Sequence, residues 1–396
     1  KNMKIGMILD SSFPPDVRVE NEAVSLIKEK HKVHLFCIDY THEKKNTEVV
    51  NGIHVYRVKL PKFLYSLSAL AYTIPIYHII LSISIYGFIK KTQIECLHIH
   101  DIQIARSVFW LNNFFRLPIV LDLHENRPEI MKYYHHVNTI LGKLLIKPTT
   151  WKNFEYKYIK KANTVITVTE EAKNYYLQNT SEPSTKFCVV PNTVRESFYK
   201  DYFVDDNIIS NFRDSFTILY LGDTGFRRGL FTVLESLKLL IPSIPNVKIV
   251  IVGKSKDDQI LKDYVLENKY HDYVTFTGWQ DFKLFQSYII ASDIGICPIH
   301  RNMHHDTTYA NKIFQYMAFG KPIVVSNCTS QQHLVEKHKC GLVFSDRNFK
   351  DFADKVITIA KNKKYYEELS KNALNAVKET FKWENTSSEL KKLYSK

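Results

Sequence analysis

Short apolar runs alternate with amphipathic stretches through the first half of the chain. Residues 4–10 form an apolar run, a Pro-containing loop follows, and residues 17–30 place apolar side chains at helical spacing. Further runs with strand-like character follow, separated by helical or polar segments: 31–39, 52–60, 96–101, 117–123, 164–169 and 187–192. Because strands that alternate with helices form parallel sheets covered on both faces, we expect a doubly wound α/β domain.

The alternation starts afresh near residue 215. Predicted strands lie at 215–221, 247–252, 273–278, 293–299, 322–326 and 341–344, and a helical pattern runs from 361 to the end. Residues 201–211 are polar and unpatterned, which is typical of a linker. We predict an α/β protein of two Rossmann-like domains, 1–200 and 201–375, with a helix over 376–396 that can return to the first domain. Open α/β sheets bind ligands beyond the carboxyl ends of their strands, so the predicted site is a cleft between the two domains.

The stretch 307–326 carries the strongest chemical signal. Its pattern predicts a polar loop, a helix with Asn311 as N-cap, a stop at Gly320 and a buried strand after Pro322. A helix that begins at the carboxyl edge of a parallel sheet offers free backbone N–H groups to an anion. The stretch therefore predicts the diphosphate site of a nucleotide-sugar enzyme.

Residues 63–89 contain no formally charged side chain and are long enough to span a bilayer. The segment also contains Pro75, His78 and several Ser and Tyr residues, and Lys62 and Lys90 flank it. These features favour one or two buried helices in the first domain. A patch on a membrane surface, which suits Tyr and Lys, is the second interpretation, and a membrane span is the third.

Composition narrows the choice of partners. The chain has 396 residues, is 45% hydrophobic and carries a net charge of +13, which suits nucleic acid, an anionic membrane or polyanionic substrates. Its basic residues are scattered among acidic ones and form no recognisable nucleic-acid-binding module, so we expect no nucleic acid as a partner. The six cysteines form no CxxC pair, which indicates free thiols in a reducing compartment. The N-terminus leads straight into a strand, so we expect no signal peptide and a cytoplasmic location, with peripheral contact at the inner face of an anionic membrane as an option.

Five segments occur in the order and at the spacing of one enzyme family. Each is weak alone, but together they are specific: 165–170, 190–192, 221–229, 251–254 and 311–322. Over nearly its whole length the chain resembles a retaining glycosyltransferase of the GT-B fold, in the large group 1 family. That resemblance implies that the second domain binds a nucleoside-diphosphate sugar and that the first binds the acceptor. It also implies catalysis without a metal ion or other cofactor, with cations and a helix terminus in their place.

The resemblance assigns the donor diphosphate to the turn 221–229. Arg228 stands there in place of the lysine that the family usually has. A guanidinium can hold the diphosphate and stabilise it as a leaving group, so Arg228 is a predicted catalytic residue. The family often has a second basic residue after the first glycine, but this chain has Asp223. The other predicted donor contacts of the two loops are Gly222, Gly225, Gly229 and Lys254.

The signature departs further from the family pattern. Family members carry two glutamates eight positions apart, and in this chain those positions are Thr307 and Gln315. Gln315 can still bind the ribose hydroxyls, though without charge assistance. Thr307 can replace a sugar-binding acid only weakly, so either neighbouring side chains hold the donor sugar or the activity is altered. The predicted donor contacts here are Tyr309, Asn311, Lys312 and Gln315, with Trp279 stacking on the nucleotide base.

In the first domain, the resemblance places a histidine at the edge that faces the donor sugar, and in this chain it is His124. We predict that His124 orients the sugar, or steadies developing positive charge through its backbone carbonyl, as a catalytic residue. The spacing of His98, His100 and Asp101 matches no strong set of metal ligands, so we predict no metal site. The predicted acceptor contacts are Asp16, Arg18, His100, Asp101 and Glu125.

These features predict a glycosyltransferase that moves a hexosyl or N-acetylhexosaminyl group from a nucleoside-diphosphate sugar to a hydroxyl of a glycan or lipid-linked acceptor, with retention. The basic surface and the apolar segment 63–89 favour surface polysaccharide or glycolipid synthesis at a membrane. A nucleotide-sugar 2-epimerase is the first alternative, and Glu125 is the one in-cleft acid that we can name for it. A non-catalytic glycosyltransferase-like subunit is the second, since Thr307 and Gln315 replace two acids.

Overall fold

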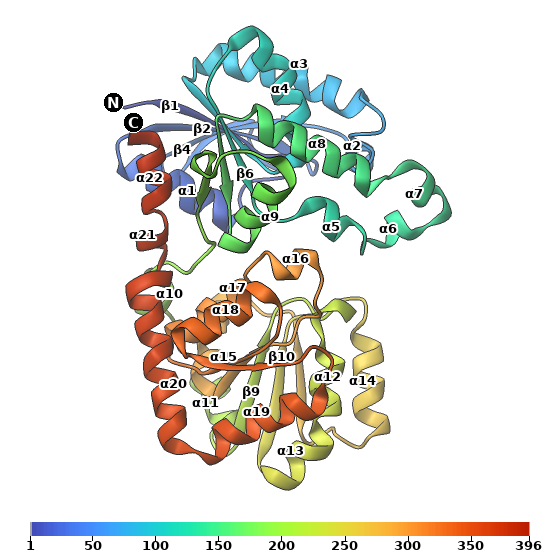
Figure 1. Ribbon diagram of the computed structural model, residues 1–396, viewed down its shortest axis with the longest axis vertical. Helices are drawn as coiled ribbons and strands as arrows, with labels where there is room; N and C mark the ends of the chain where they lie inside the picture. The colour runs from blue at the N-terminus through green and yellow to red at the C-terminus, as the bar shows by residue number, and fades with distance from the viewer. Residues whose placement is uncertain (1, 396) are drawn as a thin grey trace. The chain divides into compact units, whose positions relative to one another are not determined.

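The computed structural model describes residues 2–395, apart from the side chains of residues 66, 135, 136 and 141. Contacts between residues divide the chain into two compact units: Lys1–Pro191 together with Ser387–Lys396, and Asn192–Thr386. Each unit holds one sheet with helices on both faces (Figure 1), so the predicted fold class of two doubly wound α/β domains is confirmed. The sequence pattern placed the domain boundaries after residues 200 and 375. In the structure, the chain passes from the first unit to the second after Pro191 and returns to the first after Thr386.

The first unit is built on an eight-stranded sheet in the order β3-β4-β2-β1-β5-β6-β7-β8. Its strands are β1 (Lys4–Ile8), β2 (Lys32–Asp39), β3 (Thr47–Val50), β4 (Ile53–Lys59), β5 (Cys96–His100), β6 (Ile119–Leu123), β7 (Thr164–Thr167) and β8 (Phe187–Val189). Neighbouring strands are parallel, except that β3 runs antiparallel to β4. β5 and β6 are buried along their full length, as expected for parallel strands covered on both faces. Their polar side chains must therefore find partners inside the protein.

The helices of the first unit lie on both faces of its sheet, with α3 and α4 on one face and α1 and α22 on the other (Figure 1). They are α1 (Val17–Lys28), α2 (Lys62–Ser68), α3 (Ile76–Thr92), α4 (Ala105–Phe115), α5 (Arg127–Met131), α6 (His135–Asn138), α7 (Ile140–Leu145), α8 (Pro148–Lys161), α9 (Glu170–Thr180) and α22 (Ser388–Ser395), with short 3-10 turns at Ile102–Ile104 and Ser184–Lys186. Residues 127–161 form four helices. Thr139 ends α6 and caps α7 by accepting from the Gly142 N–H at 3.0 Å, and Pro148 starts α8.

The apolar segment 63–89 forms α2 and most of α3, with a turn between them. One face of α3 packs in the core, where Leu81 and Ile85 are fully buried. The opposite face is exposed, with Ile83 72% accessible to solvent. Among residues 2–395, no helix combines the length and the apolar character that crossing a membrane needs. The segment therefore forms two helices, of which α3 is buried on one side only.

The second unit is built on a six-stranded parallel sheet in the order β11-β10-β9-β12-β13-β14. Its strands are β9 (Phe216–Leu221), β10 (Val247–Val252), β11 (Val274–Gly278), β12 (Ile294–Cys297), β13 (Ile323–Ser326) and β14 (Gly341–Phe344). The chain order reverses between β9 and β12. In open sheets of this kind, ligands bind at that reversal, beyond the carboxyl ends of the strands.

Helices α12, α13 and α19 pack on one face of this sheet, and α15, α17 and α20 on the other. The helices of the unit are α10 (Ser197–Lys200), α11 (Asp206–Phe212), α12 (Leu230–Glu235), α13 (Leu237–Ser243), α14 (Asp258–Glu267), α15 (Phe285–Ala291), α16 (Met303–Asp306), α17 (Asn311–Ala318), α18 (Thr329–His338), α19 (Phe349–Lys361), α20 (Lys363–Ala376) and α21 (Trp383–Thr386), with 3-10 turns at Phe226–Arg228 and Phe282–Leu284 and a π-helical turn at Val377–Phe381. The predicted linker over 201–211 is wrong. Asp205 caps α11, and Phe212 of that helix is buried in the core.

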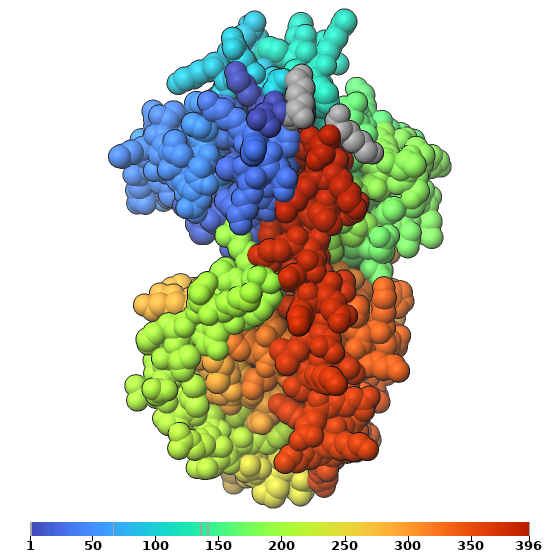
Figure 2. Space-filling model, turned by 90° about the vertical axis from the view of Figure 1, so that its left-hand side faces the viewer, coloured from blue at the N-terminus to red at the C-terminus, as the bar shows by residue number. Residues whose placement is uncertain are grey.

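The C-terminal helix α22 belongs to the first unit. It lies between the N-terminal residues, blue in Figure 2, and the green segment that contains β8. Leu390 and Tyr394 are its buried side chains, and the Tyr394 hydroxyl lies 2.7 Å from Nδ1 of His98 on β5. The end of the chain is therefore anchored by both apolar contact and a buried hydrogen bond.

The six cysteines are free thiols, as the sequence predicts. Five are buried and Cys188 is half-buried. Burial raises the pKa of Cys96 to about 12 and that of Cys340 to about 12, so both stay protonated and unreactive near neutral pH.

Candidate functional site

The predicted donor residues gather at the carboxyl edge of the second sheet, where β9 runs into the turn 222–229. Three glycines there have positive φ: +120° at Gly222, +74° at Gly229 and +136° at Gly253. A Cβ on Gly253 would lie 1.9 Å from the carbonyl O of Gly222, and one on Gly229 would lie 1.8 Å from that of Pro298. The loops after β9, β10 and β12 thus pack backbone against backbone, which only glycine allows.

Helix α17 begins beside the same turn. Its N-cap is Ala310, which has no polar side chain, and Asn311 is the first helical residue, so the predicted cap is wrong by one position. The Leu221 N–H at the end of β9 donates to the Tyr316 hydroxyl at 2.9 Å, which ties the strand to the helix. Because the first N–H groups of an α-helix have no partner within it, α17 can accept an anion at this edge.

Lys312, in the first turn of α17, points toward the glycine turn. Its Nζ lies 3.7 Å from the centroid of the Tyr220 ring, and a Cβ on Gly222 would come within 3.3 Å of it. Burial, with a contribution from the charge of Arg228, lowers the pKa of Lys312 to about 7. Near neutral pH this amine is therefore only partly protonated, and an anion beside it would restore its charge.

Arg228 lies at the end of the 3-10 turn in the same loop. Its Nε donates to Oδ2 of Asp223 at 3.0 Å. Burial would raise the pKa of Asp223, but the hydrogen bond and charge of Arg228 outweigh burial and hold that pKa below its usual value. Asp223 is therefore an ionised partner that positions Arg228, and a diphosphate would have to compete with it for the guanidinium.

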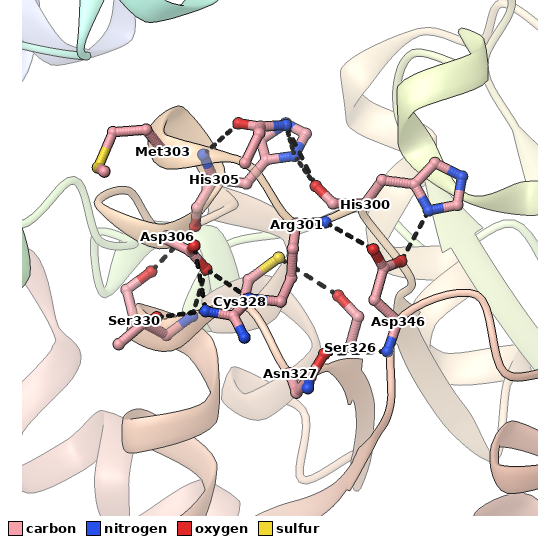
Figure 3. Close-up of polar contacts among 12 residues, drawn as sticks. His300, Arg301, Met303, His305, Asp306, Ser326, Asn327, Cys328, Ser330 and Asp346 are labelled. Carbon is pink, nitrogen blue, oxygen red and sulfur yellow. Dashed lines mark hydrogen bonds and ion pairs between the residues drawn. The ribbon is translucent and has the colours of Figure 1, made fainter.

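A polar cluster that the sequence pattern does not reveal holds the loop between β12 and α17 (Figure 3). His300 Nδ1 lies 2.8 Å from Oδ1 of Asp346, and the Arg301 N–H donates to the other carboxylate oxygen at 3.0 Å. The Arg301 guanidinium in turn pairs with Asp306 at 3.3 Å. Because the His300 N–H also donates to the carbonyl of Arg227 at 3.0 Å, the cluster fixes this loop against the glycine turn. Asp346 lies 46 positions after His300, so no local motif marks the cluster.

The remaining donor residues differ in exposure. Thr307 is buried and donates its hydroxyl to the Met303 carbonyl at 2.8 Å, within its own loop. Gln315 is half-buried, Asn311 is exposed, and Tyr309 packs edge-on against Phe314.

The other predicted donor residues lie in the loops after β9, β10 and β11. The Gly225 N–H donates to Asp223 at 3.2 Å. Lys254 and Trp279 are exposed after β10 and β11, and 68% of Trp279 is accessible. The structure therefore brings together the turn, Arg228 and Lys312. Lys254 and Trp279 lie farther along the same sheet edge, because they follow β10 and β11, the two strands on one side of β9.

In the first unit, a buried ionic network occupies the carboxyl edge of the sheet. Arg18 donates from Nε and Nη2 to the two carboxylate oxygens of Asp122, at 3.1 and 2.8 Å. Its Nη1 donates to the carbonyl of Val190 at 2.9 Å, and Nη2 lies 2.9 Å from Glu22. Burial would lower the pKa of Arg18, but these two carboxylates raise it. The guanidinium of Arg18 is therefore engaged inside the unit and holds Asp122 in place.

His100 and His124 adjoin this network. His124 Nε2 lies 3.0 Å from both Asp122 Oδ2 and His100 Nδ1, and His124 Nδ1 lies 3.5 Å from Asp101. Burial would lower the pKa of His124, but Asp101 and Asp122 raise it to about 10. Burial lowers the pKa of His100 to about 4. Near neutral pH His124 is thus a cation and His100 is neutral, so His124 is not a general base.

Four side chains of the network could offer ligands to a metal ion. One ligand atom from each of Glu22, His98, His100 and Asp122 lies within 4.8 Å of the others. The Arg18 guanidinium already contacts both carboxylates, however, and would repel a dication placed between them. The donor set therefore does not suit a metal, and the predicted absence of one stays a prediction.

Three predicted acceptor residues have partners within the first unit. Asp16 caps α1 by accepting from the Val19 N–H at 3.0 Å. Asp101 accepts from the His124 N–H at 3.0 Å, and burial raises the pKa of its carboxyl to about 6. Glu125 pairs with Arg127 at 2.9 Å.

Arg127 and Gln103 are polar residues of this edge that the sequence motifs do not mark. Arg127 Nη2 donates to Gln103 Oε1 at 2.6 Å. Both side chains line a cavity beside the sheet edge. Arg127 lies three positions after His124, just beyond a buried strand. This position is the one sequence signal that could have marked it as a site residue.

Two doubly wound units, with a glycine turn, a helix N-terminus and two basic side chains at the edge of the second, define a transferase of the GT-B fold that uses nucleotide sugars. The comparison with known families agrees: residues 16–198 match the model described as Glycosyltransferase Family 4, and residues 204–376 match the one described as Glycosyl transferases group 1. The chain belongs to the group 1 glycosyltransferases.

Individual relatives are distant. An uncharacterized glycosyltransferase of Methanocaldococcus jannaschii is 21% identical over 99% of this chain and 98% of its own length. A second one from that organism is 22% identical over 60% of this chain, and the chain spans 59% of that relative's length. Among solved structures, sucrose-phosphate synthase from Thermosynechococcus elongatus superposes with a TM-score of 0.79, at 16% identity over 100% of this chain and 98% of the other. The Anabaena protein HepE in complex with UDP-glucose superposes with a TM-score of 0.70, at 14% identity over the full length of both chains.

Proposed function

We propose that the protein transfers a hexosyl or N-acetylhexosaminyl group from a nucleoside-diphosphate sugar to a hydroxyl of a glycan or lipid-linked acceptor, with retention of configuration. One observation carries this proposal: Arg228 and Lys312 converge on the turn 222–229, next to the start of α17. Two basic groups and a helix N-terminus at one sheet edge suit a diphosphate.

The diphosphate is the leaving group of the proposed reaction. The bond between the anomeric carbon and the phosphate oxygen breaks, and its electron pair stays on the diphosphate. The acceptor oxygen bonds to the anomeric carbon on the same face, and its proton passes to the leaving phosphate oxygen. Arg228 and Lys312 stabilise the charge that develops there, which is the largest contribution expected of such a site.

Other side chains of the second unit bind the rest of the donor. Gln315 hydrogen-bonds the ribose, Trp279 stacks on the base, and Lys254 contributes a further cation. Tyr309 and Asn311 hold the sugar, since the hydroxyl of Thr307 bonds within its own loop. The glycines of the turn let the diphosphate approach the backbone.

The first unit binds the acceptor in this proposal. His124 orients the donor sugar, or faces its developing positive charge with the backbone carbonyl, because its ring nitrogens already lie near carboxylates. Asp101, Glu125 and His100 form the acceptor edge, with Asp16 at its rim. Arg18 acts indirectly, by holding Asp122 against His124.

The proposed setting is surface polysaccharide or glycolipid synthesis by a cytoplasmic enzyme with peripheral membrane contact. The basic net charge of +13 and the exposed apolar face of α3 support it. Both features suit an anionic lipid surface.

The test begins with a melting-temperature screen against nucleoside diphosphates and their sugars, UDP-glucose among them. We expect a shift with one nucleotide series, a loss of that shift in Arg228→Ala, and transfer only when an acceptor is added. The variant Leu266→Glu, at an exposed position of α14 in the same unit, is the matched control. An epimer formed from donor alone, or full transfer activity in Arg228→Ala, would refute the proposal.

A further inference from the structure

The first unit contains a cavity of about 430 Å³ beside the carboxyl edge of its sheet. Its wall is mainly apolar, with Leu70, Met131, Ile146 and Trp151 among the lining residues. Cavities of this size bury most of a small organic ligand. None of the residues assigned to the proposed transfer reaction lines this cavity.

Polar side chains line part of the cavity. Gln103 and Arg127 line it where they hydrogen-bond to one another, next to Glu125 at the proposed acceptor edge. Tyr65 and Leu145 also line it, and they are 63% and 37% accessible, so they mark its mouth. A ligand with a hydroxyl-bearing head and an apolar tail would fit in that order, head toward the sheet edge and tail toward the mouth.

The two segments that flank the mouth share an unusual composition. Residues 61–94 and 130–154 contain no Asp or Glu. They do contain Lys62, Lys143, Lys147 and other lysines, among which Lys132 pairs with Glu129 just before the second segment. They also contain exposed large apolar side chains: Phe63, Tyr65, Ile76, Ile79, Ile83, Tyr86, Tyr133, Ile140, Leu144 and Leu145.

Helices α2 and α7 lie at the mouth of the cavity and expose large apolar side chains there. Phe63 on α2 is 64% accessible, and Ile140 and Leu144 on α7 are 91% and 67% accessible. The two segments are tied together, since the Thr73 hydroxyl donates to the carbonyl of Leu145 at 2.7 Å. An apolar surface with lysines and no acids is what an anionic bilayer attracts, whereas a soluble partner gives no reason for every acid to be absent.

We propose that this cavity holds the apolar part of a membrane-borne acceptor, which enters from an anionic bilayer on which α2 and α7 lie. The inference rests on the proposed transferase function and narrows its acceptor from a glycan or lipid to a lipid. The lipid tail fills the apolar wall, and Arg127 and Gln103 hold the head beside Glu125, where the accepting hydroxyl is glycosylated.

The membrane part is tested by co-sedimentation of the full chain with phosphatidylcholine vesicles, with and without phosphatidylglycerol. We expect binding that depends on phosphatidylglycerol. Phe63→Glu and Ile140→Glu each replace an inserted apolar side chain by an acid, and each should weaken binding about tenfold or more. Leu266→Glu makes the same kind of change at a 69% accessible position of the second unit and should leave binding unchanged.

The cavity is tested with octyl β-glucoside below its micelle concentration, and with methyl β-glucoside as the matched ligand without a tail. We expect the octyl compound alone to bind, seen as a change in tryptophan fluorescence since Trp151 lines the cavity. Ala69→Trp fills the cavity and should abolish that binding. Leu145→Glu places a charge at the mouth without filling it and should weaken binding about tenfold or more.

Donor binding separates the failure of this inference from the failure of the proposed function. Nucleotide binding that persists in Ala69→Trp and Leu145→Glu, together with loss of the octyl glucoside and of transfer to a lipid acceptor, supports the inference. Equal binding of octyl and methyl glucoside, or vesicle binding unchanged in Phe63→Glu and Ile140→Glu, overturns it while the transferase function stands. If the wild-type protein binds no nucleotide, the proposed function fails whatever the lipid results are.

Discussion

The pKa of about 7 for Lys312 predicts how strongly the affinity for the donor nucleotide depends on pH. With a pKa of about 7 in the free protein, the charged fraction of Lys312 falls from about one half at pH 7 to about 1% at pH 9. A diphosphate beside the amine raises this pKa, so the complex holds more protons than the free protein above pH 7. Affinity for the nucleoside diphosphate must therefore fall as pH rises, by about 50-fold between pH 7 and pH 9, or about 2.3 kcal/mol.

Isothermal titration calorimetry measures the same linkage directly. Binding at pH 8 in two buffers of different ionisation enthalpy gives the number of protons taken up. Since Lys312 is about one-tenth protonated in the free protein at that pH, we expect uptake of about 0.9 proton for each nucleotide bound. The terminal phosphate, with a second pKa near 6, is already ionised and adds little.

Two variants isolate the lysine. Lys312→Met should bind the nucleotide more weakly at pH 7, take up almost no proton, and show an affinity that is nearly flat to pH 9. Lys312→Arg keeps a charge that does not titrate, so its affinity should also be flat but higher than that of the Met variant. Proton uptake that is equal in wild type and Lys312→Met would show that the amine does not face the diphosphate, and the assignment of the donor site to this turn would fail.

Further predictions concern folding. Gly253→Ala adds a Cβ 1.9 Å from a backbone oxygen at a φ of +136°, and it should lower the free energy of unfolding by about 3 kcal/mol or more in urea titrations; Gly278→Ala, at +70° with no atom within 4 Å of the new Cβ, should cost only about 1 kcal/mol. Burial raises the pKa of Glu155 to about 8, so the native state keeps a proton that the unfolded state releases, and wild-type stability should fall as pH rises from about 4.5 to about 8. Glu155→Gln should remove this pH dependence and be more stable than wild type at pH 9 by about 3–5 kcal/mol at most; an unchanged pH profile would contradict the burial argument. Tyr394→Phe removes the buried hydrogen bond to His98 and should cost about 1–3 kcal/mol of stability, and no measurable loss would show that this bond is dispensable for anchoring α22.

Features encoded within one continuous segment could be predicted from the sequence. The alternation of strands and helices is local, and it gave both sheets and their parallel character. The turn 222–229 and the start of α17 were found because their glycines and basic residues stand next to a buried strand. Lys312 was predicted as a donor contact, but its orientation depends on Tyr220, nearly a hundred positions earlier, which spacing alone does not reveal.

Features that arise from tertiary contacts could not be predicted. The pair of His300 and Asp346 joins the loop after β12 to the loop after β14, and neither residue belongs to a motif. Arg18 was predicted as an acceptor contact, yet α1 turns it inward onto Asp122, where two carboxylates offset the cost of burial. The linker prediction failed because α11 is short and its buried side chain, Phe212, lies just after the predicted range 201–211.

In the proposed donor site, Lys312 supplies the cation that is missing after the first glycine. Asp223 in that position pairs with Arg228, and the second positive charge comes from Lys312, which approaches Gly222 from α17. Burial, with a contribution from the charge of Arg228, lowers the pKa of Lys312 to about 7 in the free protein. In the proposed complex the amine gains its full charge beside the diphosphate, which strengthens the electrostatic stabilisation that the leaving group requires. In the proposed donor site, Asp223 therefore changes which segment supplies the second positive charge and does not remove that charge.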